Sequence, residues 1–270
     1  MLRSLVDRIC ALTAVGRPPV VCLGFHAVAD DGSMLSLPPA RFRVLVASLL
    51  ARGLRGMSVA EWRALGPAPG TAVVLTFDDG FASVHRHALP VLRDAGFTAT
   101  VFPIVAGLGR TADWRAGGVA LPRTRLLSAG ELRELTAAGW EVGGHTVDHV
   151  DLAAADPGVA FAQVRECRSR LEDLVEAPVR TFAYPHGRLS EAAVEAVEAA
   201  GFTLAVTTRP GALDARRPLR LDRFMLSPRT GPAGLRACFG PALPAVERAL
   251  GRYARVLPGT DCSRFLELAA

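Results

Sequence analysis

The stretch "AVVLTFDDGF", residues 72–81, ends a run of mostly apolar residues in two adjacent aspartates, Asp78 and Asp79. An apolar run of this length is typical of a strand in a parallel sheet that is buried on both faces. Burying one carboxylate beside another is costly unless something compensates for the charge. A divalent cation held by one aspartate would compensate, and the other would stay free as a base. The alternative is that both aspartates cap the following helix by accepting backbone N–H groups.

The rest of the chain repeats this order of an apolar run followed by an amphipathic segment. We expect strands at 19–28, 71–79, 98–107 and 179–187, and helices at 38–54, 83–97, 127–140 and 157–177. About seven such units favour a closed (β/α)7-8 barrel of parallel strands covered by helices. An open, doubly wound sheet is the alternative. No GxGxxG follows the first strand, so a dinucleotide-binding fold is not favoured.

Composition narrows the classes of partner. The net charge is +5 and every positive side chain is an arginine, but the arginines are scattered without a basic run. We therefore predict no nucleic-acid binding. The five cysteines form no CxxC pair, which favours buried free thiols in a reducing compartment over disulfides or a zinc knuckle.

We expect three segments along the chain. Residues 1–18 are an N-terminal segment whose pattern is that of an amphipathic helix. Residues 19–230 are expected to form the barrel, and residues 231–270 a helical extension. Asp7 and Arg8 interrupt what would be the apolar region of a signal peptide. No apolar run reaches the roughly 18 residues that span a bilayer. These features predict a cytoplasmic protein with peripheral contact to the inner face of the membrane through residues 1–18.

Polar residues gather where the predicted strands end, which is where parallel α/β folds place active sites. They are His26, Asp78, Asp79, His145 and the group Arg180, Tyr184, Pro185 and His186. His145 and His149 are four residues apart, and on a helical turn this spacing places both imidazoles on one face. With one carboxylate they make a His₂Asp set, a pattern of open catalytic metal sites.

Three ordered motifs carry a resemblance to a known family. "TFDDGF", "HTVDH" and "RTFAYPHG" resemble the polysaccharide deacetylases with the NodB homology domain, carbohydrate esterase family 4. The resemblance covers about residues 20–230. It implies a distorted (β/α) barrel and a metal-dependent hydrolase that removes acetyl from an N-acetylated amino sugar in a glycan or glycan precursor.

The resemblance also implies roles for single residues. Asp78 resembles the general base that takes a proton from the attacking water, and Asp79, His145 and His149 resemble the metal ligands. Zinc is the default for such a set, although cobalt, nickel, manganese or iron also suit it. Arg180 resembles the arginine that orients the base. The backbone N–H of Tyr184 takes the place of the donor that stabilises the oxyanion.

The chain departs from the commonest family pattern at the general acid. Many members carry that acid as a histidine in a Leu-x-His motif near the C-terminus, but no histidine follows His186 here. His26 in "LGFHAV" resembles the N-terminal catalytic histidine of an exopolysaccharide deacetylase subgroup with a rearranged strand order. We therefore expect His26 to be the acid, with His186 as its rival.

Pro185, His186 and Trp114 are the expected substrate contacts. Trp114 lies in the aperiodic segment 107–126 and would offer a stacking platform for a sugar. Two alternative functions stay open at this point. One is a degenerate deacetylase scaffold that acts as a carbohydrate-binding or accessory protein. The other is a hydrolase of a different C–N amide bond.

Overall fold

A computed structural model describes residues 20–66, 72–112, 115–116, 119–120 and 124–230. The expected N-terminal helix, the C-terminal extension and Trp114 lie outside the described residues. Within the described ranges, no helix has both the length and the apolar character needed to cross a bilayer.

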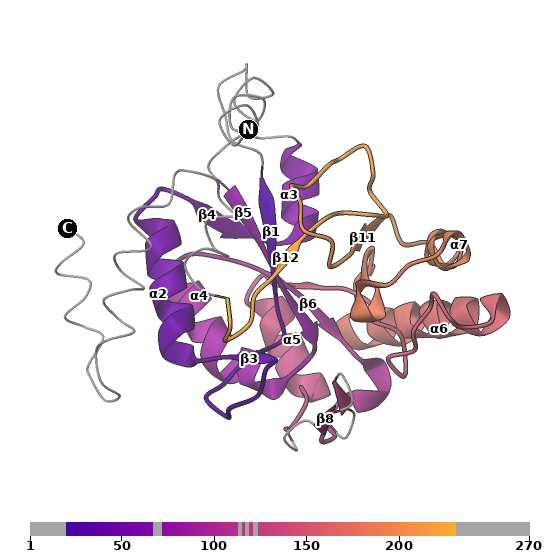
Figure 1. Ribbon diagram of the computed structural model, residues 1–270, viewed down its shortest axis with the longest axis horizontal. Coiled ribbons are helices and arrows are strands. Elements are labelled where there is room, and N and C mark those ends of the chain that lie inside the picture. Colours follow the sequence, from indigo (N-terminus) through magenta and orange to yellow (C-terminus); the bar gives the residue numbers. More distant parts are fainter. Residues whose placement is uncertain (1–19, 67–71, 113–114, 117–118, 121–123, 231–270) are drawn as a thin grey trace.

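Strand β5 (Ala72–Asp79) is the centre of the main sheet (Figure 1). Its residues Val73–Phe77 pair in parallel with the whole of β1 (Val21–Phe25). On its other side it pairs first with β4 (Arg55–Met57) and then with β6 (Thr100–Pro103). The sheet continues from β6 to β9 (Glu141–Val142). The segment "AVVLTFDD" is therefore enclosed by strands on both edges, as its apolar character predicted.

Parallel pairings carry the sheet around into a ring. Next to β9, Gly144 forms a bridge with Phe182 of β10 (Thr181–Ala183), and β10 pairs with β11 (Leu204–Val206). Val206 then bridges Leu221, and three residues later β12 (Phe224–Met225) pairs back onto β1. Among the described residues the ring contains β1, β5, β6, β9, β10, β11 and β12, which favours the predicted distorted barrel over the open sheet.

Helices lie around the outside of the strands (Figure 1). The longer ones are α2 (Pro39–Leu50), α5 (Ala129–Ala137), α6 (Pro157–Val175) and α7 (Glu191–Ala199). The shorter helical elements are α3 (Val59–Leu65), η1 (Val84–Ala88), α4 (Leu89–Asp94), η2 (Val105–Gly107) and η3 (Pro185–Gly187). Short strand pairs are formed by β2 (Ala27–Val28) with β3 (Ser36–Leu37) and by β7 (Arg115–Ala116) with β8 (Val119–Ala120).

The capping signals in the sequence set helix starts as expected. Ser128 accepts from the backbone N–H of Glu131, and the Glu131 carboxylate accepts from the backbone N–H of Ser128, which confirms the capping box of α5. Ser58 and Glu61 form a second such box at α3. The helix predicted at 83–97 begins instead with the π-helical turn η1, after which α4 continues.

Alternation along β5 decides what faces the barrel interior. Val73, Leu75 and Phe77 belong to the core shared with the outer helices, whereas Val74 belongs to the core inside the ring. Because side chains on a strand alternate, Asp78 lies on the interior side at the carboxyl end of the strand. The two cysteines that the structure describes, Cys22 and Cys167, are buried free thiols, as predicted.

Candidate metal centre and active site

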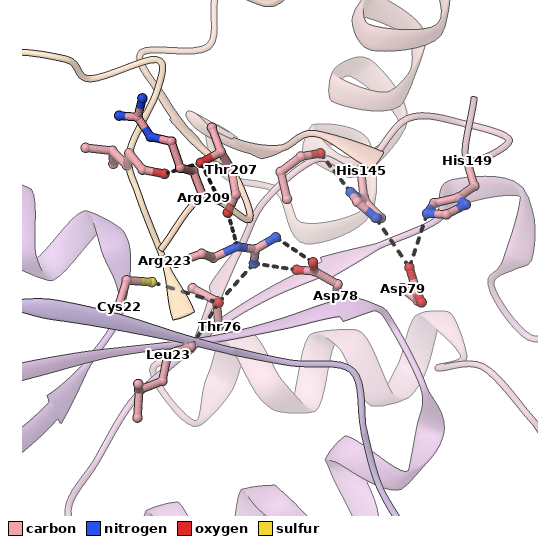
Figure 2. A network of polar contacts seen from close by, with 12 residues as sticks. Cys22, Leu23, Thr76, Asp78, Asp79, His145, His149, Thr207, Arg209 and Arg223 are labelled. Carbon is pink, nitrogen blue, oxygen red and sulfur yellow. Dashed lines mark hydrogen bonds and ion pairs between the residues drawn. The ribbon is translucent and has the colours of Figure 1, made fainter. Parts of the chain in front are cut away.

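The two aspartates at the end of β5 are turned toward different partners (Figure 2). Asp78 still has the strand's alternation and points into the barrel. Asp79 has a φ of 66°, in the left-handed region, and this breaks the alternation. Gly80 follows with a φ of 75°, and a Cβ there would lie 2.9 Å from the backbone of Pro103. The glycine after the pair is thus needed for the chain to turn so closely against β6.

Asp79 lies between two histidines. Its Oδ1 is 3.3 Å from Nε2 of His145 and 3.5 Å from Nε2 of His149. One ligand atom from each of the three residues lies within 4.8 Å of the others. Two imidazole nitrogens and one carboxylate oxygen that converge in this way fit a divalent cation of the zinc type and leave further coordination positions open. The predicted metal set is brought together by the fold.

The loop that carries the histidines is fixed at its start by close packing against β10. Gly144 donates to the carbonyl of Thr181, and the carbonyl of Gly144 accepts from Ala183. A Cβ on Gly144 would come within 2.8 Å of the Phe202 ring. His145 Nδ1 donates to the carbonyl of Ala183 at 2.7 Å, which leaves Nε2 for a metal.

The loop is not a helical turn, so the expectation from the four-residue spacing of His145 and His149 is wrong in its local structure. Thr146 has a φ of 63° and His149 a φ of 60°, both left-handed. The two rings meet because the loop folds back, with ring centroids 5.0 Å apart. Spacing alone identified the pair, but left-handed turns rather than helical periodicity bring it together.

Asp78 is paired with Arg223, and both side chains are buried. Arg223 donates from Nη1 to Oδ1 at 2.7 Å and from Nη2 to Oδ2 at 2.5 Å, a two-pronged contact (Figure 2). It also donates from Nε to the carbonyl of Thr207 and from Nη1 to the hydroxyl of Thr76. A guanidinium held at all these points has a fixed orientation toward the base.

Arg180 does not orient the base, and the expectation that it does is wrong. Arg180 is exposed and directly precedes β10, at the amino end of that strand, whereas Asp78 is at the carboxyl end of β5. Parallel strands place those two ends on opposite sides of the barrel. The arginine that contacts Asp78 is Arg223, in "LDRFML". A charged residue inside an otherwise apolar strand-like segment was the signal that could have identified it.

The backbone N–H of Tyr184 is also not available for an oxyanion, because it donates to the carbonyl of Val206 at 3.3 Å. The expectation that the Tyr184 N–H stabilises the oxyanion is therefore wrong. Pro185 has no N–H, so the next donor is that of His186, which has a φ of 59°. His186 follows shortly after β10, at the same end of the barrel as the aspartate pair.

The remaining predicted site residues lie at the same end of the barrel. His26 directly follows β1, is half-buried, and acts electrostatically on both Asp78 and Asp79. Pro185 is buried, whereas His186 is exposed with its ring edge against His149, at a centroid distance of 4.7 Å.

Charge states follow from these contacts. Burial by itself would raise the pKa of Asp78, but the guanidinium of Arg223, together with His145 and His26, holds the pKa below its ordinary value. The pKa of Asp79 is likewise lowered against the effect of burial, by the hydrogen bond from His145 and the charge of His26. Burial lowers the pKa of His149 to about 4. The site therefore holds two carboxylates and a neutral imidazole at neutral pH.

Known proteins resemble this chain over most of its length. YxkH of Bacillus subtilis strain 168, assigned to the polysaccharide deacetylases, is 25% identical over 211 residues, which cover 76% of this chain and 71% of YxkH. The poly-β-1,6-N-acetyl-D-glucosamine N-deacetylase of Escherichia coli K12 is 23% identical over 244 residues. That alignment covers 77% of this chain but only 36% of the enzyme. The structure of Streptococcus pyogenes deacetylase PplD in complex with acetate matches with a TM-score of 0.70 and 25% identity, covering 83% of this chain and 100% of PplD.

The family model described as polysaccharide deacetylase matches residues 66–205, more than half of the chain. The matched segment contains the aspartate pair and both histidines of the metal set, whereas His26 and Arg223 lie outside it. The motifs, the barrel and the convergent Asp-His-His set agree with this match. The chain belongs to the polysaccharide deacetylase family.

Proposed function

We propose that this protein is a metal-dependent hydrolase that removes acetyl from an N-acetylated amino sugar in a glycan or glycan precursor. The observation that carries the proposal is the juxtaposition of Asp79, His145 and His149 with Asp78, a buried carboxylate that a buried arginine keeps ionised. A ligand set with a separate base beside it is what amide hydrolysis by water requires.

Asp79, His145 and His149 would hold the metal, for which we propose zinc because the set offers two imidazoles and one carboxylate. When bound, a divalent cation polarises the acetyl carbonyl and lowers the pKa of a neighbouring water. The carbonyl of Ala183 keeps the His145 ring in the tautomer that presents Nε2.

Asp78 is placed to take a proton from the attacking water. Its two oxygens face Arg223, so the carboxylate is held in one orientation and keeps a second lone pair on each oxygen for the water. The oxygen of the water adds to the acetyl carbon, and the backbone N–H of His186 is the chain's donor to the developing oxyanion. The C–N bond then breaks, and acetate and the free amine are the products.

The leaving amine needs a proton, for which we propose His26. It directly follows β1 at the carboxyl end of the barrel, and it lies close enough to both aspartates to influence their pKa values. Asp78 and His26 would thus move one proton each, one from the water and one to the amine.

The relatives support an N-acetylated glycan as the substrate class. The Escherichia coli relative is named for N-deacetylation of poly-β-1,6-N-acetyl-D-glucosamine, and the Streptococcus pyogenes structure holds acetate, the product of deacetylation. The intact metal set and base disfavour a degenerate scaffold that only binds carbohydrate. We therefore place the sugar amide ahead of other C–N bonds as the bond that is cleaved.

The test combines metal content with acetate release from N-acetylglucosamine oligomers. Wild type, Asp78→Asn, Asp79→Ala and His26→Ala would be purified, analysed for bound metal and assayed. We expect metal in all except Asp79→Ala, and acetate from the wild type at a rate at least about 100-fold above Asp78→Asn. Metal without acetate from any N-acetyl sugar would point to another amide. A wild type that cannot be loaded with zinc would overturn the proposal.

A further inference from the structure

We propose that Gln163 and Cys167 of α6 are positioning residues that hold the loop 145–149 in its metal-binding conformation. The inference rests on the proposed metal site but concerns the protein's own scaffold. Neither residue belongs to the three sequence motifs. Both act through the backbone of the loop rather than on the substrate.

The loop needs external support because its own conformation is unfavourable. Thr146 and His149 both have φ values near 60°, and a left-handed conformation is costly for a β-branched residue such as threonine. The hydroxyl of Thr146 is buried and has no hydrogen-bond partner in the described structure. The side chain at the centre of the motif therefore contributes no hydrogen bond that would offset the strain.

Gln163 supports the second half of the loop. Its Oε1 accepts from the backbone N–H of Val147 and from that of Asp148, each at 3.0 Å. Its Nε2 donates to Oδ2 of Asp148 at 2.8 Å. A single side-chain amide thus fixes the backbone N–H groups of the two residues directly before His149.

Cys167 supports the first half. Its sulfur lies beside the backbone N–H groups of His145 and Thr146, which act electrostatically on the thiol. The side chain is fully buried, and burial raises the pKa of the thiol to about 12, so the sulfur is a neutral acceptor. The sulfur also packs closely against Gly144, where a Cβ would lie 3.2 Å away. Sulfur is a weak acceptor, so Cys167 supports this half of the loop mainly by close packing.

The two side chains work as one template because residues four apart share a face of a helix. Together they cover four consecutive backbone N–H groups, because Gln163 accepts from residues 147 and 148 and the sulfur of Cys167 lies beside those of residues 145 and 146. The opposite side of the loop is held by η2, since the carbonyls of Thr146 and Val147 accept from the N–H groups of Val105 and Ala106. With its donors fixed by α6 and its carbonyls by η2, the loop keeps the distance between its two histidines.

The first test is zinc affinity of the metal-free protein, measured by competition with a chelator. Removing an outer partner of a metal ligand typically costs 10–100-fold in affinity, so we expect about 10-fold weaker zinc binding for Gln163→Met and for Cys167→Ala. Cys167→Ser keeps an acceptor and should restore affinity to within a few-fold of wild type. Val164→Ala removes a buried α6 side chain between the two and should lower the melting temperature without changing affinity.

The second test is hydrogen exchange of the loop amides in the same metal-free proteins. Gln163→Met should speed exchange at residues 147 and 148, and Cys167→Ala at residues 145 and 146, each by about 10-fold or more. This readout holds whether or not the protein releases acetate, so it separates failure of this inference from failure of the proposed function. Wild-type affinity and exchange in both folded variants, or equal losses in Val164→Ala, would overturn the inference.

Discussion

A carboxylate is enclosed at each end of the barrel, and the two carboxylates differ in the charge of their hydrogen-bond partners. At the carboxyl end, Asp78 is paired with the buried guanidinium of Arg223. At the amino end, Glu141 begins β9 and, among the described residues, accepts from neutral donors. These donors are the hydroxyls of Thr100 and Thr181 and the backbone N–H of Ala60. The first carboxylate is the proposed base, and the second ties together the starts of β6, β9 and β10.

The partners decide the charge of each group. Burial disfavours the ionised form at both positions, but Arg223 reverses this at Asp78 and lowers the pKa of its carboxyl. At Glu141 the hydrogen bonds do not overcome burial, and the pKa is raised. In this barrel the presence of a countercharge decides whether the pKa of an enclosed carboxyl is lowered or raised. Of the two carboxylates, Asp78, the proposed base, has such a countercharge in Arg223.

Arg223→Met should have the largest effect, because it removes the countercharge that distinguishes Asp78 from Glu141. It leaves Asp78 buried without a countercharge, so the unfolding free energy should fall by about 3–5 kcal/mol. The pKa of Asp78 should rise, and acetate release at neutral pH should fall with it. Chemical denaturation measures the first effect and the rate of acetate release the second.

The double variant Asp78→Asn with Arg223→Met is the control for that result. It removes the unpaired charge, so it should be more stable than Arg223→Met alone while remaining inactive. If Arg223→Met has wild-type stability and activity, the countercharge argument is wrong.

Glu141→Gln is the matching change at the amino end and should have a much smaller effect. The amide keeps an oxygen that can accept from Ala60 and Thr100, and the hydroxyl of Thr181 can rotate to accept instead of donating. We expect a change in unfolding free energy of about 1 kcal/mol or less and unchanged zinc binding. A loss as large as that in Arg223→Met would show that Glu141 is also held as an anion.

The sequence predicted the fold because its strands and helix starts follow strong local rules. The apolar run at 72–79 could only be an enclosed strand, and the Ser128–Glu131 pair marked a helix start that the structure confirms. The same holds for the metal set, whose members sit in short motifs. The strand and the helix start depend on residues that are close together in the chain. The metal set depends on the rule that parallel strands bring their carboxyl ends to the same end of the barrel.

The sequence misled where function depends on contacts between distant segments. Arg223 pairs with Asp78 across 145 positions of the chain. Its place in the segment "LDRFML" marks it as unusual, but that local pattern does not show which carboxylate it reaches. Tyr184 was misassigned because its N–H is taken by a neighbouring strand, a fact of sheet pairing. The left-handed turns at Thr146 and His149 were missed because four-residue spacing is typical of a helix as well.

The pH dependence of the unfolding free energy tests the raised pKa of Glu141. The folded pKa of Glu141 is raised above its ordinary value of 4.5, so in the window from pH 4.5 up to the folded pKa the folded state binds more protons than the unfolded state. Stability contributed by this group therefore falls as pH rises through that window and stays lower above it. Unfolding measured at pH 4 to 8 should show Glu141→Gln gaining on the wild type as pH rises. A difference that is independent of pH would contradict the raised pKa.

Arg180→Ala should have the smallest effect, and it separates the two arginines directly. The side chain of Arg180 is exposed at the amino end of the barrel, and the contacts it makes to Thr203 and Leu204 use its carbonyl, which alanine retains. Stability should change by less than about 0.5 kcal/mol, and acetate release and zinc affinity should match the wild type. If Arg180→Ala instead lowered activity as Arg223→Met does, the base would depend on the arginine of the third motif after all. The structural assignment of Arg223 as the partner of Asp78 would then be wrong.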